Sequence, residues 1–249
     1  VSDRTYVNSQ TPDPGFAIKG DVTYLYPNKD PANPDITSVN VDTDLNIQWS
    51  ITGNIQYVAI DYDNNSGNGQ DGTPGTSDDY TGVVVAQTDA SAGSYVWHIP
   101  ADSTVVSDHI RIRVRDYNDS TVYDTSEVDF KIKPTISITV PAGGEEWIVN
   151  ELRTIQWSTK GFAAGEQVKI QYSIDGGNTW PTGAPYEITT IDASALTYDW
   201  SIPDTLSSEC VLRISKATDS EVYKDSNWFT IKGKLDITQP DGGVNLPIN

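Results

Sequence analysis

Short phrases recur along this 249-residue chain at a domain-sized interval. They are Phe-x-Ile-Lys at residues 16–19, 130–133 and 229–232, Ile-Gln-Trp-Ser at 47–50 and 155–158, Trp-x-Ile-Pro at 97–100 and 200–203, and Asp-Ser-x-Val-Tyr at 119–123 and 219–223. Successive copies of a phrase lie 99 to 114 residues apart. Solenoid repeats run to about 20–50 residues, so this longer period predicts a tandem array of domains that each have their own core.

Both ends of the chain fall within further copies. The stretch before the first Phe-x-Ile-Lys phrase resembles the closing strands of a repeat, and KLDITQPDGG at residues 234–243 matches TISITVPAGG at residues 135–144. We therefore predict four segments: 1–20, the closing strands of a preceding repeat; 21–134, the first complete repeat; 135–233, the second; and 234–249, the first strand of a following repeat.

The composition predicts an all-β fold. Hydrophobic residues make up 37% of the chain, with 13 Tyr and 7 Trp, which is enough apolar surface for a core in each repeat. Thr, Val, Ile, Tyr and Trp gather in short runs separated by Gly, Pro, Asn and Asp, the pattern of strands and turns. In the second repeat the strands are expected at 136–140, 153–158, 167–174, 186–190, 196–201, 211–216 and 222–231. Seven strands in a hundred residues are typical of an antiparallel β-sandwich, with Ile155 and Trp157 in its core.

The second repeat resembles the Ig-like repeats of large secreted bacterial surface proteins, including those of surface layers (S-layers). Such repeats open with a Pro-x-Gly-Gly-Glu-x-Trp phrase and close near Val-Tyr-x-x-Ser-x-x-Phe-x-Ile. The matching residues are Pro141, Gly143, Gly144, Glu145, Trp147, Ile155, Trp157, Val222, Tyr223, Ser226, Phe229 and Ile231. The first repeat departs from the opening phrase, with YPNKDPANPD at residues 26–35. The resemblance implies tandem Ig-like, fibronectin III-like sandwiches outside the cell or at its surface.

Charge restricts the partners. Acidic residues number 35 and basic residues 16, giving a net charge of −19, so nucleic acid is not an expected partner. No apolar stretch approaches the roughly 20 residues of a membrane helix, and we expect no membrane insertion in this segment. The lone Cys210 is expected to be a buried thiol.

An acidic loop distinguishes the first repeat. Residues 61–80 stand where a hairpin turn is expected, and the segment from Tyr62 to Tyr95 is about seven residues longer than that from Tyr172 to Tyr198. The loop does not follow the EF-hand pattern, but its oxygen-rich side chains suit an irregular Ca²⁺ site, with an exposed acidic loop as the alternative. The predicted ligands are Asp61, Asp63, Asn65, Asp71, Asp78 and Asp79.

In the second repeat the corresponding hairpin reads SIDGGNTW at residues 173–180, which matches the Asp-box of sialidase-like propellers. We interpret it as a structural turn, in which Ser173 and Asp175 bond turn amides and Trp180 folds back. Neither His98 nor His109 is required by the repeat, and adjacent Glu145 and Glu146 point to opposite faces of a strand. No metal-binding or nucleophile motif is present, so we expect no enzyme activity.

The sequence thus favours a non-enzymatic structural module of a secreted surface protein, whose partners are other copies or neighbouring repeats and, in some settings, cell-wall glycans. Two alternatives stay open. An adhesin or carbohydrate-binding module would use exposed aromatic rings, the candidates being Trp97, Trp147, Trp180, Trp200 and Trp228, of which Trp97 and Trp200 recur and are expected in the core. An accessory spacer would belong to a larger extracellular enzyme.

Overall fold

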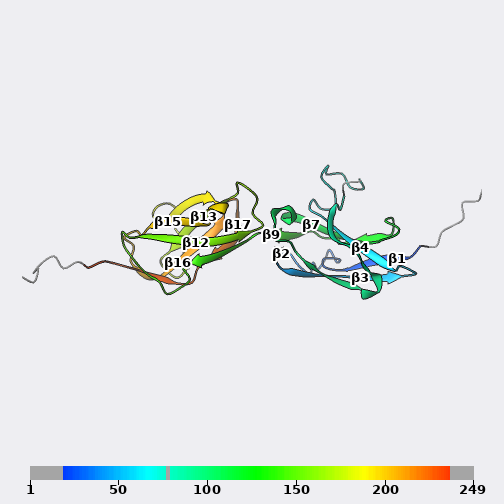
Figure 1. Ribbon diagram of the computed structural model, residues 1–249, viewed down its shortest axis with the longest axis horizontal. Helices are drawn as coiled ribbons and strands as arrows, with labels where there is room; N and C mark the ends of the chain where they lie inside the picture. The colour runs from blue at the N-terminus through cyan, green and yellow to red at the C-terminus, as the bar shows by residue number, and fades with distance from the viewer. Residues whose placement is uncertain (1–18, 77–78, 236–249) are drawn as a thin grey trace, which may run out of the picture. The chain divides into compact units, whose positions relative to one another are not determined.

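The computed structural model describes residues 19–76 and 79–235. Within them the regular structure is almost entirely β-strand (Figure 1). The first nine strands are β1 (Asp21–Tyr26), β2 (Ser38–Asn40), β3 (Asp44–Thr52), β4 (Tyr57–Asp63), β5 (Gly82–Asp89), β6 (Ser94–His98), β7 (Ser107–Asp116), β8 (Tyr123–Thr125) and β9 (Phe130–Lys133), with 3-10 turns η1 (Ala90–Ala92) and η2 (Ser103–Val105).

The strands that follow repeat this series. They are β10 (Thr135–Val140), β11 (Glu146–Ile148), β12 (Leu152–Lys160), β13 (Gln167–Ser173), β14 (Glu187–Asp192), β15 (Thr197–Ser201), β16 (Ser207–Lys216), β17 (Asp219–Asp225) and β18 (Phe229–Lys232), with the 3-10 turn η3 (Ala193–Ala195). No helix among the described residues is long and apolar enough to span a membrane.

Backbone proximity divides the chain into two compact units. Of the described residues, one unit contains those up to Thr37 with those of Asn46–Trp97 and His109–Phe130, and the other contains Ser38–Leu45, His98–Asp108 and those from Lys131 onward. Strand pairing divides it differently, because within the described residues β1–β9 pair only with one another and β10–β18 only with one another. We follow the pairing, since backbone hydrogen bonds define a sheet, and call the two groups the first and second sandwich.

Each sandwich has the same two sheets. A three-stranded sheet has the order β1-β3-β6 in the first sandwich and β10-β12-β15 in the second. The larger sheet has the order β2-β9-β7-β4-β5, with β8 on β7, and correspondingly β11-β18-β16-β13-β14, with β17 on β16. The opening segment of each repeat contributes to both sheets, and its second part pairs in parallel with the last strand. This arrangement is an Ig-like antiparallel β-sandwich, which confirms the predicted fold class.

The core of each sandwich lies between its sheets and is aromatic at the centre. Trp157 is 3% exposed, beside the fully buried Ile155, and its indole nitrogen donates to the Ala193 carbonyl at η3. In the first sandwich Trp49 donates to the carbonyl of Ala90 at 2.9 Å. Both indole N–H groups therefore have an acceptor, as buried polar atoms require. The burial of Trp157, like that of Cys210, confirms the sequence prediction.

Two details of the second repeat differ from the sequence prediction. The strand β11 was not predicted, because its three residues are too few to show alternation. The segment expected at 222–231 is two strands, since Ser226–Trp228 interrupt the ladder before β18 joins β11 and β16. The predicted domain boundaries stay a prediction, and the flanking segments 1–20 and 234–249 lie almost wholly outside the described residues.

The opening turn of the first repeat, which lacks the Gly pair, is built around Asn28. This side chain is fully buried, and its amide exchanges two hydrogen bonds with the backbone of Ile36, at 2.9 and 2.8 Å. In the second repeat Glu145 accepts from the backbone nitrogens of Ala142 and Gly143. A side chain thus organises this turn in both repeats, by different chemistry.

The break between the last two strands generates a stability prediction. Ser126 is fully buried, and its hydroxyl accepts from the backbone nitrogen of Ile112 at 3.0 Å, as Ser226 accepts from Leu212. Replacing Ser126→Ala leaves a buried N–H unpaired, so we expect a loss of about 1–3 kcal/mol in the free energy of unfolding, measured by urea denaturation. The exposed Ser120→Ala is the control. Equal stability of the two variants would contradict the assignment.

Candidate functional site

The acidic loop begins at a carboxylate that is paired with arginines. Asp61 on β4 is 4% exposed, and its Oδ2 accepts from Arg113 at 2.9 Å and from Arg115 at 2.7 Å, both on the adjacent strand β7. The arginine side chains are about one quarter exposed. Two guanidinium groups therefore balance the charge of this carboxylate within the sheet surface.

The next two predicted ligands shape the backbone. Oδ2 of the buried Asp63 accepts from the backbone nitrogens of Asn65 at 3.0 Å and Gly67 at 2.7 Å. The Asn65 amide donates to the carbonyl of Gly69 at 2.8 Å. Both side chains thus hold a turn that follows β4, as Asp and Asn commonly do.

The second sandwich builds the same turn with other residues. Ser173 Oγ accepts from the backbone nitrogens of Asp175 and Gly177, at 3.3 and 3.1 Å, and Asp175 accepts from Thr179 at 2.9 Å. Trp180 folds back and donates to the Gly177 carbonyl. These contacts confirm the structural interpretation of the Asp-box phrase. They also show that the first repeat keeps this turn, with Asp63 in the place of Ser173, and that its extra residues follow the turn.

The outer part of the loop contains a second acidic group. Asp71 accepts from the Thr73 nitrogen at 2.7 Å, and Asp79 accepts from the Gly75 nitrogen at 2.6 Å. The Thr76 hydroxyl lies 3.5 Å from Asp71 and 3.3 Å from Asp79, which brings these two carboxylates near each other. The remaining predicted ligand, Asp78, lies outside the described residues.

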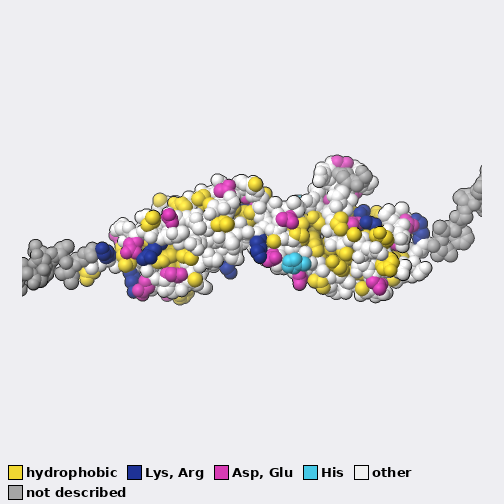
Figure 2. All heavy atoms as spheres, in the orientation of Figure 1, with side chains coloured by type: hydrophobic (Ala, Val, Ile, Leu, Met, Phe, Trp, Pro, Cys, Tyr) yellow, Lys and Arg dark blue, Asp and Glu magenta, His cyan; other side chains and the backbone are white. Residues whose placement is uncertain are grey.

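The predicted ligands therefore divide into an inner set, whose side chains are hydrogen-bonded to the sheet and to the first turn of the loop, and an outer pair. Among residues 19–76 and 79–235, no three His, Cys, Asp or Glu side chains are grouped as a metal site requires. Acidic side chains are scattered over the face shown in Figure 2. The Ca²⁺ site stays a prediction, which now concerns the outer pair more than Asp61, Asp63 and Asn65.

The base of the loop is anchored to the sheet. The Ser66 nitrogen donates to the carbonyl of His109 at 2.9 Å, and its hydroxyl donates to Asp129 at 2.5 Å. Arg111 donates to the other oxygen of Asp129 at 2.6 Å. Burial raises the pKa of Asp129, but these hydrogen bonds, with one from His109, outweigh it and hold the pKa below its ordinary value. The loop is thus fixed at its first turn.

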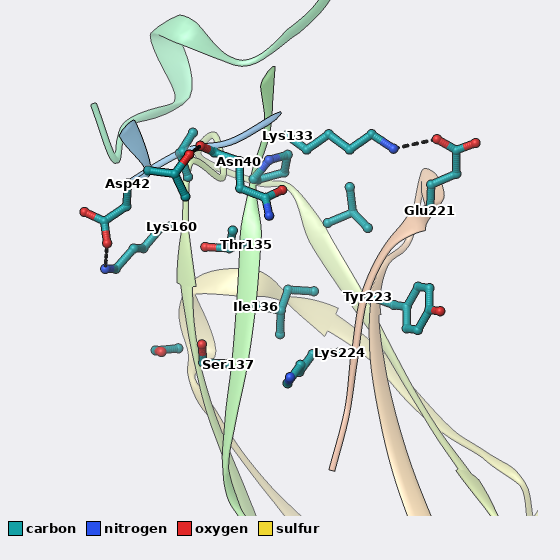
Figure 3. A pocket seen from close by; sticks show the side chains of 15 residues that line it. Asn40, Asp42, Lys133, Thr135, Ile136, Ser137, Lys160, Glu221, Tyr223 and Lys224 are labelled. Carbon is teal, nitrogen blue, oxygen red and sulfur yellow. Dashed lines mark hydrogen bonds and ion pairs between the residues drawn. The ribbon is translucent and has the colours of Figure 1, made fainter. Parts of the chain in front are cut away.

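An arginine between two aromatic rings accompanies each loop and was missed by the sequence reasoning. The Arg113 guanidinium lies 4.8 Å from the ring of Tyr80 and 5.8 Å from that of Tyr123. In the second sandwich the distances from Arg213 are 4.0 Å to Trp180 and 4.1 Å to Tyr223. Each of these three residues of the first sandwich lies 100 positions before its counterpart in the second, a signal that the repeated sequence contained. Figure 3 shows the Tyr223 ring projecting away from β10, whereas Lys224 extends toward it. These cation–π contacts fasten the loop to the outer face of the sheet.

The other residues considered from sequence serve the fold or lie at the surface. Trp97, Trp147 and Trp200 are each no more than 5% exposed, whereas Trp228 is 55% exposed and packs beside Gly176. His98 is exposed; its hydrogen bond to Asp44 raises its pKa. Burial raises the pKa of the Cys210 thiol, which disfavours the reactive thiolate.

Comparisons with known proteins give likenesses of fold. No family model and no curated protein matches the sequence. Fibronectin(III)-like modules of Clostridium thermocellum CbhA align at 12% identity over 85% of this chain and 94% of theirs, with a TM-score of 0.27. A chimeric titin Z1Z2 tandem aligns at 13% identity over 80% and 95%, with a TM-score of 0.28. The first two Ig domains of DIP-gamma align at 8% identity over 85% and 97%, with a TM-score of 0.28.

The arginine pair on Asp61 generates a prediction about the loop without any metal. Asp61→Asn removes the carboxylate that balances Arg113 and Arg115 at short range, so we expect a loss of roughly 2 kcal/mol or more in the free energy of unfolding. Urea denaturation in EDTA measures it. The control is Asp71→Asn, since Asp71 lies in the exposed part of the loop and its change should cost under about 0.5 kcal/mol. A larger loss of stability for the control, or no loss for Asp61→Asn, would contradict the structural role assigned to Asp61.

The Asp-box turn generates a pH prediction. Hydrogen bonds from Ser173 and then from Thr179 lower the pKa of Asp175 to about 2, from an ordinary value near 3.8. A lowered folded-state pKa contributes stability that is present above the unfolded-state pKa and is lost as the pH falls toward 2. We expect the Asp175 carboxyl carbon to titrate near pH 2 by NMR, and Asp175→Asn to reduce the loss of stability between pH 4 and pH 2. A midpoint close to 3.8 would contradict the hydrogen-bonded turn.

Proposed function

We propose that this chain is a non-enzymatic structural segment of a long, secreted cell-surface protein of the surface-layer kind. The observation that carries the proposal is that both repeats use their distinctive polar and aromatic residues for the same internal contacts. The hydrogen-bonded turn, with Asp63 in the place of Ser173, the arginine between two rings and the serine between the last strands all recur. Residues used in this way position backbone and sheet, and they do not supply a reaction centre.

The proposed role is that of a spacer. Each sandwich has its own core and hydrogen-bonded sheets, so it keeps its form without a partner. The connecting segments at residues 133–135 and 232–234 are short, and short connections limit the freedom of neighbouring domains. Repetition of such units would extend a surface protein away from its anchor.

We further propose that acidic side chains of the outer loop take part in assembly through Ca²⁺. A net charge of −19 makes copies repel one another, and a divalent cation bound between carboxylates would offset that repulsion. Asp71 and Asp79, together with Asp78, are the residues proposed to bind it. The partners would be other copies of the protein or neighbouring repeats.

A calcium titration tests this assembly. We expect Ca²⁺ to raise the melting temperature of the chain and to increase its sedimentation coefficient at high protein concentration, with EDTA reversing both effects. A double variant, Asp71→Asn with Asp79→Asn, should lose the response, and the exposed Asp30→Asn should keep it as the matched control. If melting and sedimentation are the same in Ca²⁺ and in EDTA, the calcium-linked assembly is wrong.

A second candidate function is an adhesin or carbohydrate-binding module, and one observation favours it. The indole of Trp228 is 55% exposed beside the Asp-box turn, where it could stack on a sugar ring. Loss of glycan binding in Trp228→Ala would support this function, whereas Trp147 is a core residue whose removal would report on stability instead. An accessory role beside an enzyme is decided by the rest of the parent chain, which would then contain a catalytic domain.

A further inference from the structure

An exposed turn of the first sandwich carries a short sequence that the proposed function does not use. Residues 116–120, at the end of β7 and before β8, read Asp-Tyr-Asn-Asp-Ser. The pattern Asn-x-Ser or Asn-x-Thr, with x other than proline, is the acceptor of N-linked glycans on secreted proteins. The chain contains one other match, Asn64 followed by Ser66. Because a motif this short also occurs by chance, the surroundings of each match decide whether it is able to accept a glycan.

The turn at Asn118 leaves the carboxamide and the hydroxyl of the motif accessible. Asn118 and Ser120 are exposed, and within residues 19–76 and 79–235 neither side chain has a hydrogen-bonding partner. The backbone nitrogen of Asn118 donates to Oδ1 of Asp116 at 2.8 Å, and that of Val122 donates to the Asp119 carbonyl at 3.0 Å. These bonds hold the backbone of the turn without using the two side-chain groups that a glycosyl transferase must recognise.

The other match is built into the base of the acidic loop. The Ser66 hydroxyl donates to Asp129 at 2.5 Å, and the Ser66 nitrogen donates to the His109 carbonyl at 2.9 Å. Asn65, the middle residue of this match, donates to the Gly69 carbonyl. A transferase would have to break these contacts to reach the Ser66 hydroxyl, and each lost hydrogen bond costs stability. The folded chain therefore offers Asn118 and withholds Asn64.

An acidic residue stands two positions before Asn118. Bacterial oligosaccharyltransferases that act on exported proteins recognise Asp or Glu at this position, in addition to the Asn and the hydroxyl. Asp116 occupies it, whereas Tyr62 stands two positions before Asn64. Asp116 is partly exposed, and among the described residues its Oδ2 has no hydrogen-bonding partner. A cationic group of the transferase could thus pair with this carboxylate.

The comparison between repeats shows that the motif is not simply the sequence of the shared turn. The equivalent turn of the second repeat, residues 216–220, reads Lys-Ala-Thr-Asp-Ser. The closing Asp-Ser pair is common to both turns, but Thr218 stands in the place of Asn118 and Lys216 in the place of Asp116. The acceptor and the acidic residue before it are therefore both particular to the first repeat.

We propose that Asn118 is the acceptor of one N-linked oligosaccharide. The proposal rests on the export proposed above, because the sugar donor, an oligosaccharide carried on a polyprenyl pyrophosphate, is used on the outer side of the membrane. Nδ2 of Asn118 forms the bond to the anomeric carbon of the first sugar as the bond from that carbon to the pyrophosphate oxygen breaks. The amide nitrogen gives up one proton, and the polyprenyl pyrophosphate leaves. The exposed turn accommodates the oligosaccharide without losing a contact of the fold.

Expression with a bacterial oligosaccharyltransferase tests the proposal. The full chain, with an added signal peptide, is exported to the periplasm of cells that supply the transferase and one lipid-linked oligosaccharide of known mass. We expect the intact mass to increase by one oligosaccharide, which peptide fragmentation places on Asn118. The modified fraction should fall at least tenfold in Asn118→Gln and in Ser120→Ala, and it should be retained in Ser120→Thr, which keeps a hydroxyl.

Matched variants test the choice of site. Asn64→Gln should leave the modified fraction unchanged. Thr218→Asn creates Asn-Asp-Ser in the exposed turn of the second repeat but keeps Lys216 two positions before it, so we expect no second oligosaccharide. Asp116→Ala should lower the modified fraction at least tenfold, and Asp116→Glu should retain it. Melting temperatures establish that the variants are folded.

Three outcomes would overturn the proposal: no modification of the chain in cells that modify a reference acceptor protein, an oligosaccharide on Asn64 instead, or unchanged modification of Asn118→Gln. Equal modification of Asp116→Ala, or a second oligosaccharide in Thr218→Asn, would overturn the part assigned to Asp116. Because the added signal peptide exports the chain, these results do not depend on the proposed surface role, which the calcium titration tests separately.

Discussion

Each sandwich depends on one indole placed between its two sheets. Burying a Trp side chain removes a large apolar surface from water, but its N–H must find an acceptor in the same place. Trp49 and Trp157 meet this requirement at the carbonyl of a residue in the 3-10 turn before the last strand of the smaller sheet. Asp89 caps this 3-10 turn in the first sandwich, and Asp192 caps it in the second. The capping carboxylate, the turn and the core indole therefore form one connected unit. The same unit joins the two sheets in both sandwiches.

The sequence predicted those parts of the fold that alternate or repeat. Alternation placed Ile155 and Trp157 inside, and the recurring phrases indicated two sandwiches of one class. Features that depend on contacts across the sheet could not be predicted: β11 is too short to show a period, and the break at Ser226 is visible only once its hydroxyl is seen to accept from Leu212. The arginine between two rings had a sequence signal, the common spacing of 100 residues, which has no meaning until the sheet brings the three side chains together.

The acidic loop illustrates a different limit. Its composition suggested one site, because Asp and Asn side chains are the oxygen donors that hard cations prefer. The same groups also accept hydrogen bonds from arginines and from turn amides, and composition does not distinguish these uses. Asp61 accepts a hydrogen bond from Arg113, and Asp63 accepts one from the Gly67 amide. Asp71 and Asp79 lie near each other further out in the loop. The comparison between repeats was more informative than composition, since Ser173 and Asp63 perform one task.

The parallel pairing of the last strand with the opening segment has a mechanical consequence. In the second sandwich β18 pairs in parallel with β11, at Glu146 with Thr230 and at Ile148 with Lys232. A pull on the two ends of such a sandwich drags these strands past each other along their length. All the hydrogen bonds of the pair then bear the load together and must rupture nearly at once, instead of opening one after another as in a zipper. Resistance to shear is thus set by a few backbone hydrogen bonds between the opening segment of each repeat and its last strand.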